Sequence, residues 1–365
     1  MPVIQYFPKY FVSFRRWRPC MGEMTGDKPS TITKPMKNIT IVLSIGAMSA
    51  GILCCGCSKH IAAGTGPASN VESNATAIAV PDDAVAMKIK WNPGKKYEMR
   101  MELQRDTETQ LPDRPAPVGQ EVNLTQNYNV TVLKELDDGG RQLQLAFEDE
   151  TLDVTQRDRR VLSYNSMESA AQDATNPAAA MLRLLDGARL QLVTDAGGTV
   201  EKMEGLDELK ERVATTGQPR QQMMFKQMFD EDTLERYCSF GDMMPDHPVK
   251  AGDSWSLKTD SFSPAGRVAI DLQYTFEGWV QQGNHNWAYI EQTGEVSPQN
   301  LSGANTPGVQ VEKGTISSDI WFDPELGMIA GISSEQKITL KVMVRGQTIR
   351  PQMDQKIQLT LVDVQ

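Results

Sequence analysis

One short stretch gathers the soft side chains that could bind copper. CSFGDMMPDHP offers a thiol at Cys238, thioethers at Met243 and Met244, and an imidazole at His247. Thiolate and thioether ligands suit Cu(I), so these four residues form the candidate metal site. The alternative is structural, because the spacing matches no established metal motif, a lone cysteine usually packs as a small hydrophobe, and two prolines make the stretch a loop.

Catalytic chemistry is harder to find. Nucleophilic hydrolysis needs a Ser or Cys beside a His base, and the three histidines, His60, His247 and His285, accompany no G-x-S-x-G motif. GISSE lacks the second glycine, and the sequence has neither a glycine-rich phosphate loop nor a dinucleotide fingerprint. We therefore predict no catalytic residue and no cofactor. With 47 acidic residues, a carboxylate-dependent hydrolase of envelope or extracellular polymers stays as the alternative.

A methionine-rich segment is the candidate ligand-binding site. QPRQQMMFKQMF places Met223, Met224, Phe225, Met228 and Phe229 within two helical turns. Flexible thioethers adapt to varied apolar ligands. The alternative is core packing, since a helix lying on a sheet needs such an apolar face.

Most of the chain shows the period-two alternation of half-buried strands. DDGG between two such runs predicts a hairpin, because glycine accepts the positive φ of a tight turn. Such alternation gives each strand one buried and one solvent-exposed face, and few helix-length segments separate the strands. Both features indicate an antiparallel sheet. The apolar alternation covers residues 85–91, 97–103, 122–132, 143–147, 268–276, 287–289, 316–322, 338–344 and 357–361.

The middle of the chain predicts a helical insert at about 176–240, packed on the sheet. NPAAAMLRLLDG begins with a proline and ends with a glycine, the usual asymmetry of a short helix. LDELKERV places Leu206, Leu209 and Val213 on one helical face. We expect a mainly β (α+β) fold of curved antiparallel sheets with this insert.

Three pairs of segments recur in the same order and suggest a duplicated β-unit. NPGKKYEMRMEL resembles KAGDSWSLKTDS, each is followed by a long hairpin, and LVTDAGGTV resembles WFDPELGMI. The pseudo-repeats would span 83–240 and 241–365, each a half-barrel-like unit. Short strands joined by glycine turns always look somewhat alike, which is the alternative.

The N-terminal region resembles a lipoprotein signal. MKNITIVLSIGAMSAGILCCGC (from Met36) has a basic start and an apolar run too short to span a membrane. Gly56 before Cys57 makes Cys57 the expected lipid acceptor, and Ser58 favours the outer membrane. We interpret 1–35 as an extension from a mis-assigned start, 36–56 as the signal peptide, 57–82 as a flexible tether and 83–365 as the β-rich domain. A long basic leader is the alternative for 1–35.

The leader and the strand starts together carry a family resemblance. The sequence resembles an uncharacterised family of bacterial secreted lipoproteins, domain-of-unknown-function family 6263. The resemblance lies in the leader, in the strand starts PGKKY and AGDSW, and in the hairpin IWFDPELGMI. The resemblance covers most of residues 83–365 and implies no activity or catalytic residue. The layout is also similar to lipoprotein-carrier half-barrels, a comparison of architecture alone.

Charge narrows the partners further. The net charge is −10, and residues 1–56 carry seven of the 37 Lys and Arg but two of the 47 Asp and Glu. The remaining chain is therefore more acidic still, which argues against nucleic acid as a partner. We expect an exported, non-enzymatic binding module, anchored by lipid in the cell envelope at the outer membrane or periplasmic face. Its partner would be an apolar ligand or another envelope protein; a purely structural envelope component is a further alternative.

Overall fold

The computed structural model describes residues 76–77, 84–112, 114–169, 177–183, 186–216, 238–263, 266–282, 285–298, 309–344 and 346–365. The chain divides into two units, Met1–Ile39 and Thr40–Gln365. All described residues belong to the second unit.

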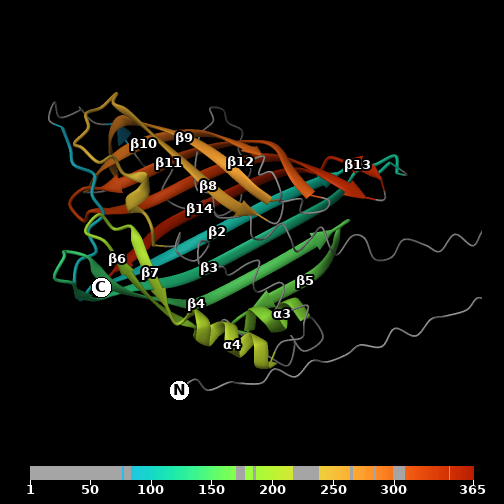
Figure 1. Cartoon of the computed structure of the whole chain (residues 1–365), viewed down its shortest axis with the longest axis horizontal. Helices are drawn as coiled ribbons and strands as arrows, with labels where there is room; N and C mark the ends of the chain where they lie inside the picture. Colours follow the sequence, from blue (N-terminus) through green and yellow to red (C-terminus); the bar gives the residue numbers. More distant parts are fainter. Residues whose placement is uncertain are drawn as a thin grey trace, which may run out of the picture. The chain divides into compact units, whose positions relative to one another are not determined.

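Fourteen strands of the described residues pair into one antiparallel sheet (Figure 1). Their order is β1-β9-β10-β11-β12-β14-β2-β3-β4-β6-β7, with β13 beside β12, β5 beside β4 and β8 beside β9. The predicted mainly β architecture is thus confirmed. The strands are β1 (Thr76–Ala77), β2 (Lys96–Thr109), β3 (Val118–Glu135), β4 (Arg141–Gln156), β5 (Arg159–Asn165), β6 (Arg189–Thr194), β7 (Val200–Glu204), β8 (Ser254–Ser263), β9 (Gly266–Gln282), β10 (His285–Pro298), β11 (Val309–Asp323), β12 (Met328–Val344), β13 (Gln347–Ile349) and β14 (Gln352–Val364).

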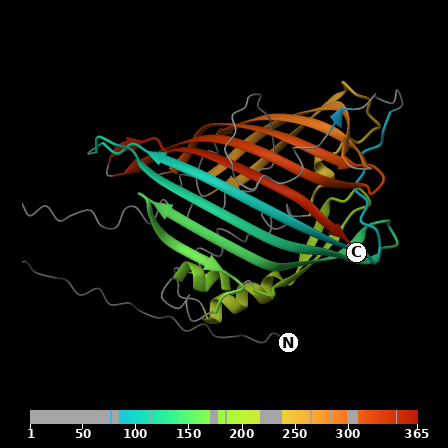
Figure 2. The ribbon, with the colours of Figure 1, turned by 180° about the vertical axis from the view of Figure 1, so that it is seen from behind.

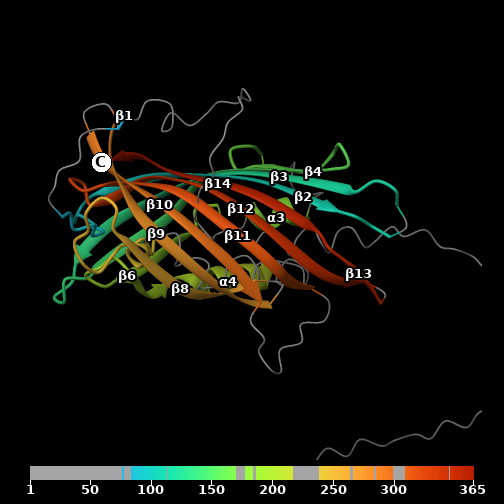
Figure 3. The ribbon, with the colours of Figure 1, turned by 90° about the horizontal axis from the view of Figure 1, so that it is seen from above.

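Pairing between β14 and β2 joins the two halves of the sheet. Seen from behind, β14 lies directly beside β2, followed by β3 and β4 (Figure 2). From above, β9 to β12 run obliquely to β2 and β3 (Figure 3), the cumulative twist expected of a large sheet. Strand β2 illustrates that one face of the sheet is buried. Its alternate residues Tyr97, Met99, Met101 and Leu103 are buried, and the residues between them are more exposed.

The helices lie beside β5 and β7 at one edge of the sheet (Figure 1). They are α3 (Pro177–Leu182) and α4 (Leu206–Thr216), and a 3-10 turn covers Gly241–Met243. As predicted, α4 buries Leu206, Leu209 and Val213, which join the hydrophobic core. No helix among the described residues is long and apolar enough to cross a membrane.

The predicted insert at 176–240 is not helical throughout. Strands β6 and β7 form a hairpin between α3 and α4 and extend the sheet from β4. The turn between them explains the difference, because Asp195 accepts amide hydrogen bonds from Gly197 and Thr199 through Oδ1, and Gly198 has a φ of +87°. Such a turn connects strands rather than helices.

The alternating segment 85–91 also differs from its prediction as a strand. Its one ladder contact is the isolated bridge between Val85 and Val249, while Met87, Ile89 and Trp91 are nonetheless buried. The amide of Lys90 donates to the carbonyl of Gly327 (2.7 Å), in the turn between β11 and β12. Alternation here reports one buried side of an extended segment, not membership of a sheet.

The two segments proposed as repeat starts form the same turn. Gly94 and Gly252 both have positive φ, +78° and +92°. The amide of Gly94 donates to the Val132 carbonyl (3.0 Å) and that of Gly252 to the Phe276 carbonyl (2.7 Å). Each turn leads into the first strand of a meander, β2-β3-β4 or β8-β9-β10. A gene duplication would produce this correspondence; the pseudo-repeats stay a prediction.

Candidate ligand-binding face

One side of the sheet, here called the inner face, collects the buried member of each alternating pair. Two cross-strand rows on this face are wholly apolar. The first runs through Ile290, Ile320, Ile332, Leu359 and Met101. The second runs through Val296, Gly314, Ile338 and Met353.

Between these rows lies a line of buried polar side chains, here called the polar band. Its members are Gln292 on β10, Ser318 on β11, Ser334 and Gln336 on β12, Gln355 on β14 and Arg105 on β2. The register makes Gln292 and Ser318 direct partners, then Ser318 and Ser334. The band shifts by two residues along β12 and continues through the pairs Gln336–Gln355 and Gln355–Arg105. Direct partners share one face of a sheet, so the band crosses five strands.

Arg105 supplies the positive charge of the band. Its side chain is 1% exposed and ranks among the largest fully buried side chains of the described residues. Burial lowers the pKa of the guanidinium to about 10, because removal from water disfavours the charged form. The group still carries its charge at neutral pH. Cross-strand neighbours on either side are Gln355 and Val122.

The glutamines of the band present more donors than their neighbours accept. Gln355 Nε2 donates to Gln336 Oε1 (3.4 Å), and Ser318 Oγ donates to Gln292 Oε1 (3.3 Å). The Nε2 atoms of Gln292 and Gln336 have no hydrogen-bond partner among the described residues, and each side chain is 1% exposed. Leaving a buried donor unsatisfied costs about 1–3 kcal/mol. Such an arrangement calls for a specific explanation.

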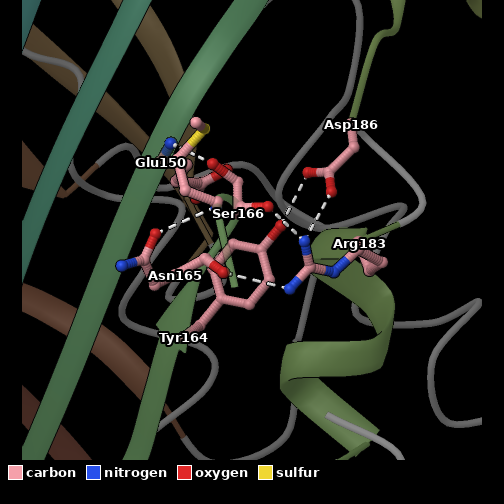
Figure 4. A network of polar contacts seen from close by, with 7 residues as sticks. Glu150, Tyr164, Asn165, Ser166, Arg183 and Asp186 are labelled. Carbon is pink, nitrogen blue, oxygen red and sulfur yellow. Dashed lines mark hydrogen bonds and ion pairs between the residues drawn. The ribbon is translucent and has the colours of Figure 1, made fainter. Parts of the chain in front are cut away.

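A second polar network ties α3 to the β4–β5 hairpin (Figure 4). Tyr164 OH donates to Asp186 Oδ1 (2.7 Å), and Arg183 binds Asp186 Oδ2 (3.0 Å) and the Asn165 carbonyl (3.0 Å). The guanidinium also lies 5.0 Å from the centre of the Tyr164 ring. Ser166 Oγ accepts the backbone amide of Glu150 (2.9 Å). Both carboxylate oxygens of Asp186 accept hydrogen bonds within the protein. This geometry fits a structural role in which the network holds α3 against the β4–β5 hairpin.

Glu150 is the titratable group of this network. It lies on β4 opposite Gln126, and its side chain is buried. Burial, with a further contribution from the negative charge of Asp186, raises the pKa of the Glu150 carboxyl to about 8. A hydrogen bond from Gln126 opposes this shift. The pKa of Tyr164 is raised as well, by burial first and then by its hydrogen bond to Asp186.

The residues of the predicted copper site lie in different environments. Cys238 is fully buried, and burial raises the pKa of its thiol to about 12, so the thiol keeps its proton at neutral pH. Met243 and Met244 pack against the core, whereas His247 is exposed with Nδ1 2.6 Å from Asp246 Oδ1. Among the described residues, no three His, Cys, Asp or Glu side chains gather as metal ligands. The four-residue copper site stays a prediction.

The other predicted sites lie outside the described residues. These are the lipid acceptor Cys57 and the ligand-binding set Met223, Met224, Phe225, Met228 and Phe229.

Sequence reasoning missed the polar band, although a signal was present. Gln336, Gln355 and Arg105 occupy inward positions of alternating runs whose other inward residues are mostly apolar. A polar residue at an inward position is the pattern to search for. Glu150 carried a weaker signal, because a β-bulge between Asn127 and Tyr128 shifts the register of β3 against β4 at this point.

A family model matches part of the chain that forms this geometry. Residues 140–329 match the model of a family of unknown function, DUF6263, a span of just over half the chain. The chain belongs to this family. Within the DUF6263 span lie Glu150, Asp186, Gln292 and Ser318, while β2 and β14 bring Arg105 and Gln355 from outside it. The predicted resemblance to this family is confirmed over residues 140–329, and the lipoprotein character expected with it stays a prediction.

Three solved structures are similar to this chain. A structure on lipid–protein interactions in lipovitellin has a TM-score of 0.40 at 10% identity and covers 76% of this chain, which spans 26% of that one. A putative exported protein with a YmcC-like fold from Bacteroides fragilis NCTC 9343 has a TM-score of 0.26 at 10% identity, covering 77% of this chain and 99% of its own. A DUF1329 family protein from Desulfovibrio piger ATCC 29098 has a TM-score of 0.12 at 8% identity, covering 75% and 86%.

These TM-scores lie below 0.5, so the three structures do not bear on the site. No curated protein matches the sequence. The function is therefore inferred from the geometry of the inner face.

Proposed function

We propose that this DUF6263 protein is a non-enzymatic binding protein that holds an apolar ligand against the inner face of its sheet. The observation that carries the proposal is the polar band between two apolar rows. Ligand sites are typically apolar surfaces with a few convergent polar groups that fix orientation. The band and its flanking rows have this composition.

Packing alone is a poor explanation for the band. Replacing its members by Ile or Leu would continue the neighbouring rows and remove two unsatisfied donors, each costing about 1–3 kcal/mol. Stability lost at one place commonly reflects a functional demand there. Arg105 adds a buried charge to the band, and taking a charge out of water costs free energy even where the charge has a partner.

The absence of a role in catalysis is part of the proposal. What supports it is the placement of the two acidic groups of the network beside α3: Glu150 is buried, and Asp186 is engaged by Tyr164 and Arg183. A ligand recovered with unchanged mass after prolonged incubation with the full chain would support binding without turnover. A recovered hydrolysis product would contradict it.

Attachment to the cell envelope through Cys57 completes the proposal. The sequence supports it through Gly56 before Cys57 at the end of an apolar run. Cys57→Ser should abolish incorporation of labelled palmitate and release the chain from membranes. The neighbouring Cys54→Ser and Cys55→Ser are matched controls and should keep both. Labelling that survives Cys57→Ser would overturn the assignment of the acceptor.

Binding of an uncharged apolar probe tests the central part. The full chain should bind 1-aminoanthracene saturably, with a fluorescence increase that a long-chain alcohol reverses by competition. The heat-denatured chain is the control for non-specific adsorption. Non-saturable binding equal to that of the control would contradict the proposal.

A further inference from the structure

We infer that the turn of the β4–β5 hairpin contacts the surface of an anionic phospholipid bilayer. The segment RDRR, residues 157–160, forms this turn and the start of β5, and is here called the arginine tip. The inference rests on the proposed attachment to the cell envelope, which brings the chain to a bilayer, and adds a second contact with that surface. It does not involve the inner face of the sheet.

The arginine tip is basic within an acidic protein. It carries three arginines and one aspartate, whereas the whole chain has a net charge of −10, and all four residues are exposed. Arg160 Nε lies 3.3 Å from Asp153 Oδ1, with the two side chains 65% and 40% exposed. Among the described residues, no ion pair engages Arg157 or Arg159. Because an exposed ion pair contributes little free energy, all three guanidinium groups are available to an external partner.

The backbone of the tip shows that its residues do not suit the turn they form. Arg157 and Asp158 have φ values of +50° and +60°, and they are the only non-glycine residues with positive φ in the described part of the chain. Two consecutive positive φ values define a hairpin turn that favours Asn-Gly or Asp-Gly. Left-handed backbone is strained for most other side chains. Arg157 therefore occupies its position against the conformational preference of the turn.

Other turns of the sheet place glycine where the chain adopts a positive φ. These glycines are Gly139 between β3 and β4, Gly198 between β6 and β7, Gly327 between β11 and β12, and Gly346 between β12 and β13. The β4–β5 turn differs from these four because it contains no glycine. Strained residues of this kind are concentrated at functional sites. The arginine at position 157 thus points to a role outside the fold itself.

Phospholipid head groups match the chemistry of the tip. A guanidinium group keeps its charge at physiological pH and binds phosphate oxygens through two parallel hydrogen bonds. Basic residues at a membrane surface are attracted to anionic lipids. Val161 follows the tip and is 52% exposed, at a β-bulge between Val154 and Thr155. An exposed apolar side chain beside arginines suits the boundary between head groups and acyl chains.

The position of the hairpin leaves the tip accessible to a flat surface. Strand β5 lies at an edge of the sheet, where it pairs with β4 (Figure 1). The turn is at the end of β5 away from α3, and its residues are exposed. With three arginines the contact is weak, so it would orient a chain that the lipid at Cys57 holds at the membrane.

Vesicle flotation of the full chain tests the inference. Binding to phosphatidylcholine vesicles is compared with binding to vesicles in which phosphatidylglycerol replaces part of the phosphatidylcholine. Each basic residue at an anionic surface changes the affinity about fivefold. Arg157→Gln combined with Arg159→Gln should therefore weaken binding to the anionic vesicles by about tenfold or more and leave binding to phosphatidylcholine unchanged. Raising the salt concentration should reduce the preference of the unmodified chain for anionic vesicles.

The matched control removes the same charge elsewhere. Arg100→Gln combined with Arg189→Gln changes exposed arginines on β2 and β6 and should keep the binding of the unmodified chain. The basic leader is the same in every chain, so a difference between the two double variants reports the tip. A single variant, Arg157→Asn, should weaken binding about fivefold. It should also raise the midpoint of thermal unfolding, because asparagine tolerates positive φ.

Three results would overturn the inference. One is equal binding of the unmodified chain to both kinds of vesicle, and another is an equal loss of binding in the tip and control variants. The third is tip-dependent binding to poly-glutamate without tip-dependent binding to vesicles, which would indicate an acidic protein as the partner. Palmitate labelling of Cys57 tests the anchor and 1-aminoanthracene tests the inner face, so each can succeed where the tip fails.

Discussion

Arg105 and Gln355 are direct cross-strand partners on the pair β2–β14 that joins the two halves of the sheet, and each side chain is 1% exposed. This pair places a cation and an amide where the surrounding rows carry isoleucine, leucine and methionine. The pairing also links residues from the two ends of the sheet-forming chain. The site we propose therefore depends on the closure of β14 onto β2.

Gln292 is expected to lower stability in return for binding. Gln292→Leu removes an unsatisfied buried donor, so the free energy of unfolding of the ligand-free chain should rise by about 1 kcal/mol. Gln273→Leu, an exposed glutamine on the neighbouring strand β9, should change it by less than about 0.5 kcal/mol. Urea denaturation measures both. A loss of stability in Gln292→Leu would show that the amide is satisfied in the folded chain.

Glu150 should make the folded state less stable as pH rises. Its pKa is about 8 in the folded chain against an ordinary value of 4.5, so between these values the folded state holds a proton that the unfolded state has released. The free energy of unfolding should therefore fall from about pH 4.5 to about pH 8, by up to about 1.4 kcal/mol per pH unit from this group. Glu150→Gln keeps the hydrogen-bonding shape and should flatten this slope.

The control for that titration is the adjacent Asp149→Asn, an exposed carboxyl on the opposite face of β4. Urea denaturation at a series of pH values compares the three chains. An Asp149→Asn slope equal to that of wild type and a flatter Glu150→Gln slope are expected. Equal slopes in Glu150→Gln and wild type would contradict a raised pKa at Glu150.

Asp186 should influence Glu150 through its charge. Asp186→Asn removes the negative charge that helps to raise the pKa of Glu150, so this pKa should fall. Carbon-13 NMR of labelled glutamate carboxyls, assigned by the signal lost in Glu150→Gln, measures it. The same titration in Asp149→Asn is the control. A Glu150 pKa that is unchanged or higher in Asp186→Asn would show that the two groups do not interact in this way.

Gly198 should resist substitution because of both backbone and space. Its φ is +87°, and an added Cβ would lie 2.9 Å from Cβ of Ile89. Gly198→Ala should therefore lower the free energy of unfolding by about 2 kcal/mol. Gly119→Ala, where a Cβ meets nothing within 4 Å, should change it by less than about 0.5 kcal/mol. Equal stability of the two variants would contradict the tight β6–β7 turn.

The alternation of apolar residues predicted the strands and their buried face because that pattern is local. The helical face of Leu206, Leu209 and Val213 was predictable for the same reason. Segment 85–91 misled because extended chain buries alternate residues whether or not its backbone joins a sheet. The local alternation of apolar residues thus predicts which side chains are buried more reliably than it predicts which strands pair.

The polar band could not be assembled from the sequence, since its neighbours meet only through register. Gln355 faces Arg105 because β14 returns to pair with β2, and no local pattern states that pairing. The cluster from Cys238 to His247 shows that residues close together in the sequence can have different environments in the fold. Residues close in sequence suggested a metal site, whereas the structure buries the thiol and exposes the imidazole.

Photocrosslinking tests most directly whether the inner face is the binding site. The full chain is irradiated with a palmitate that carries a diazirine in its acyl chain, and labelled residues are identified by peptide mass spectrometry. We predict labels on inner-face residues flanking the band, such as Ile338, Met353 and Leu359, that excess palmitate suppresses. Labels confined to exposed outer-face residues of the same strands, or labels that excess palmitate leaves unchanged, would contradict binding at the inner face.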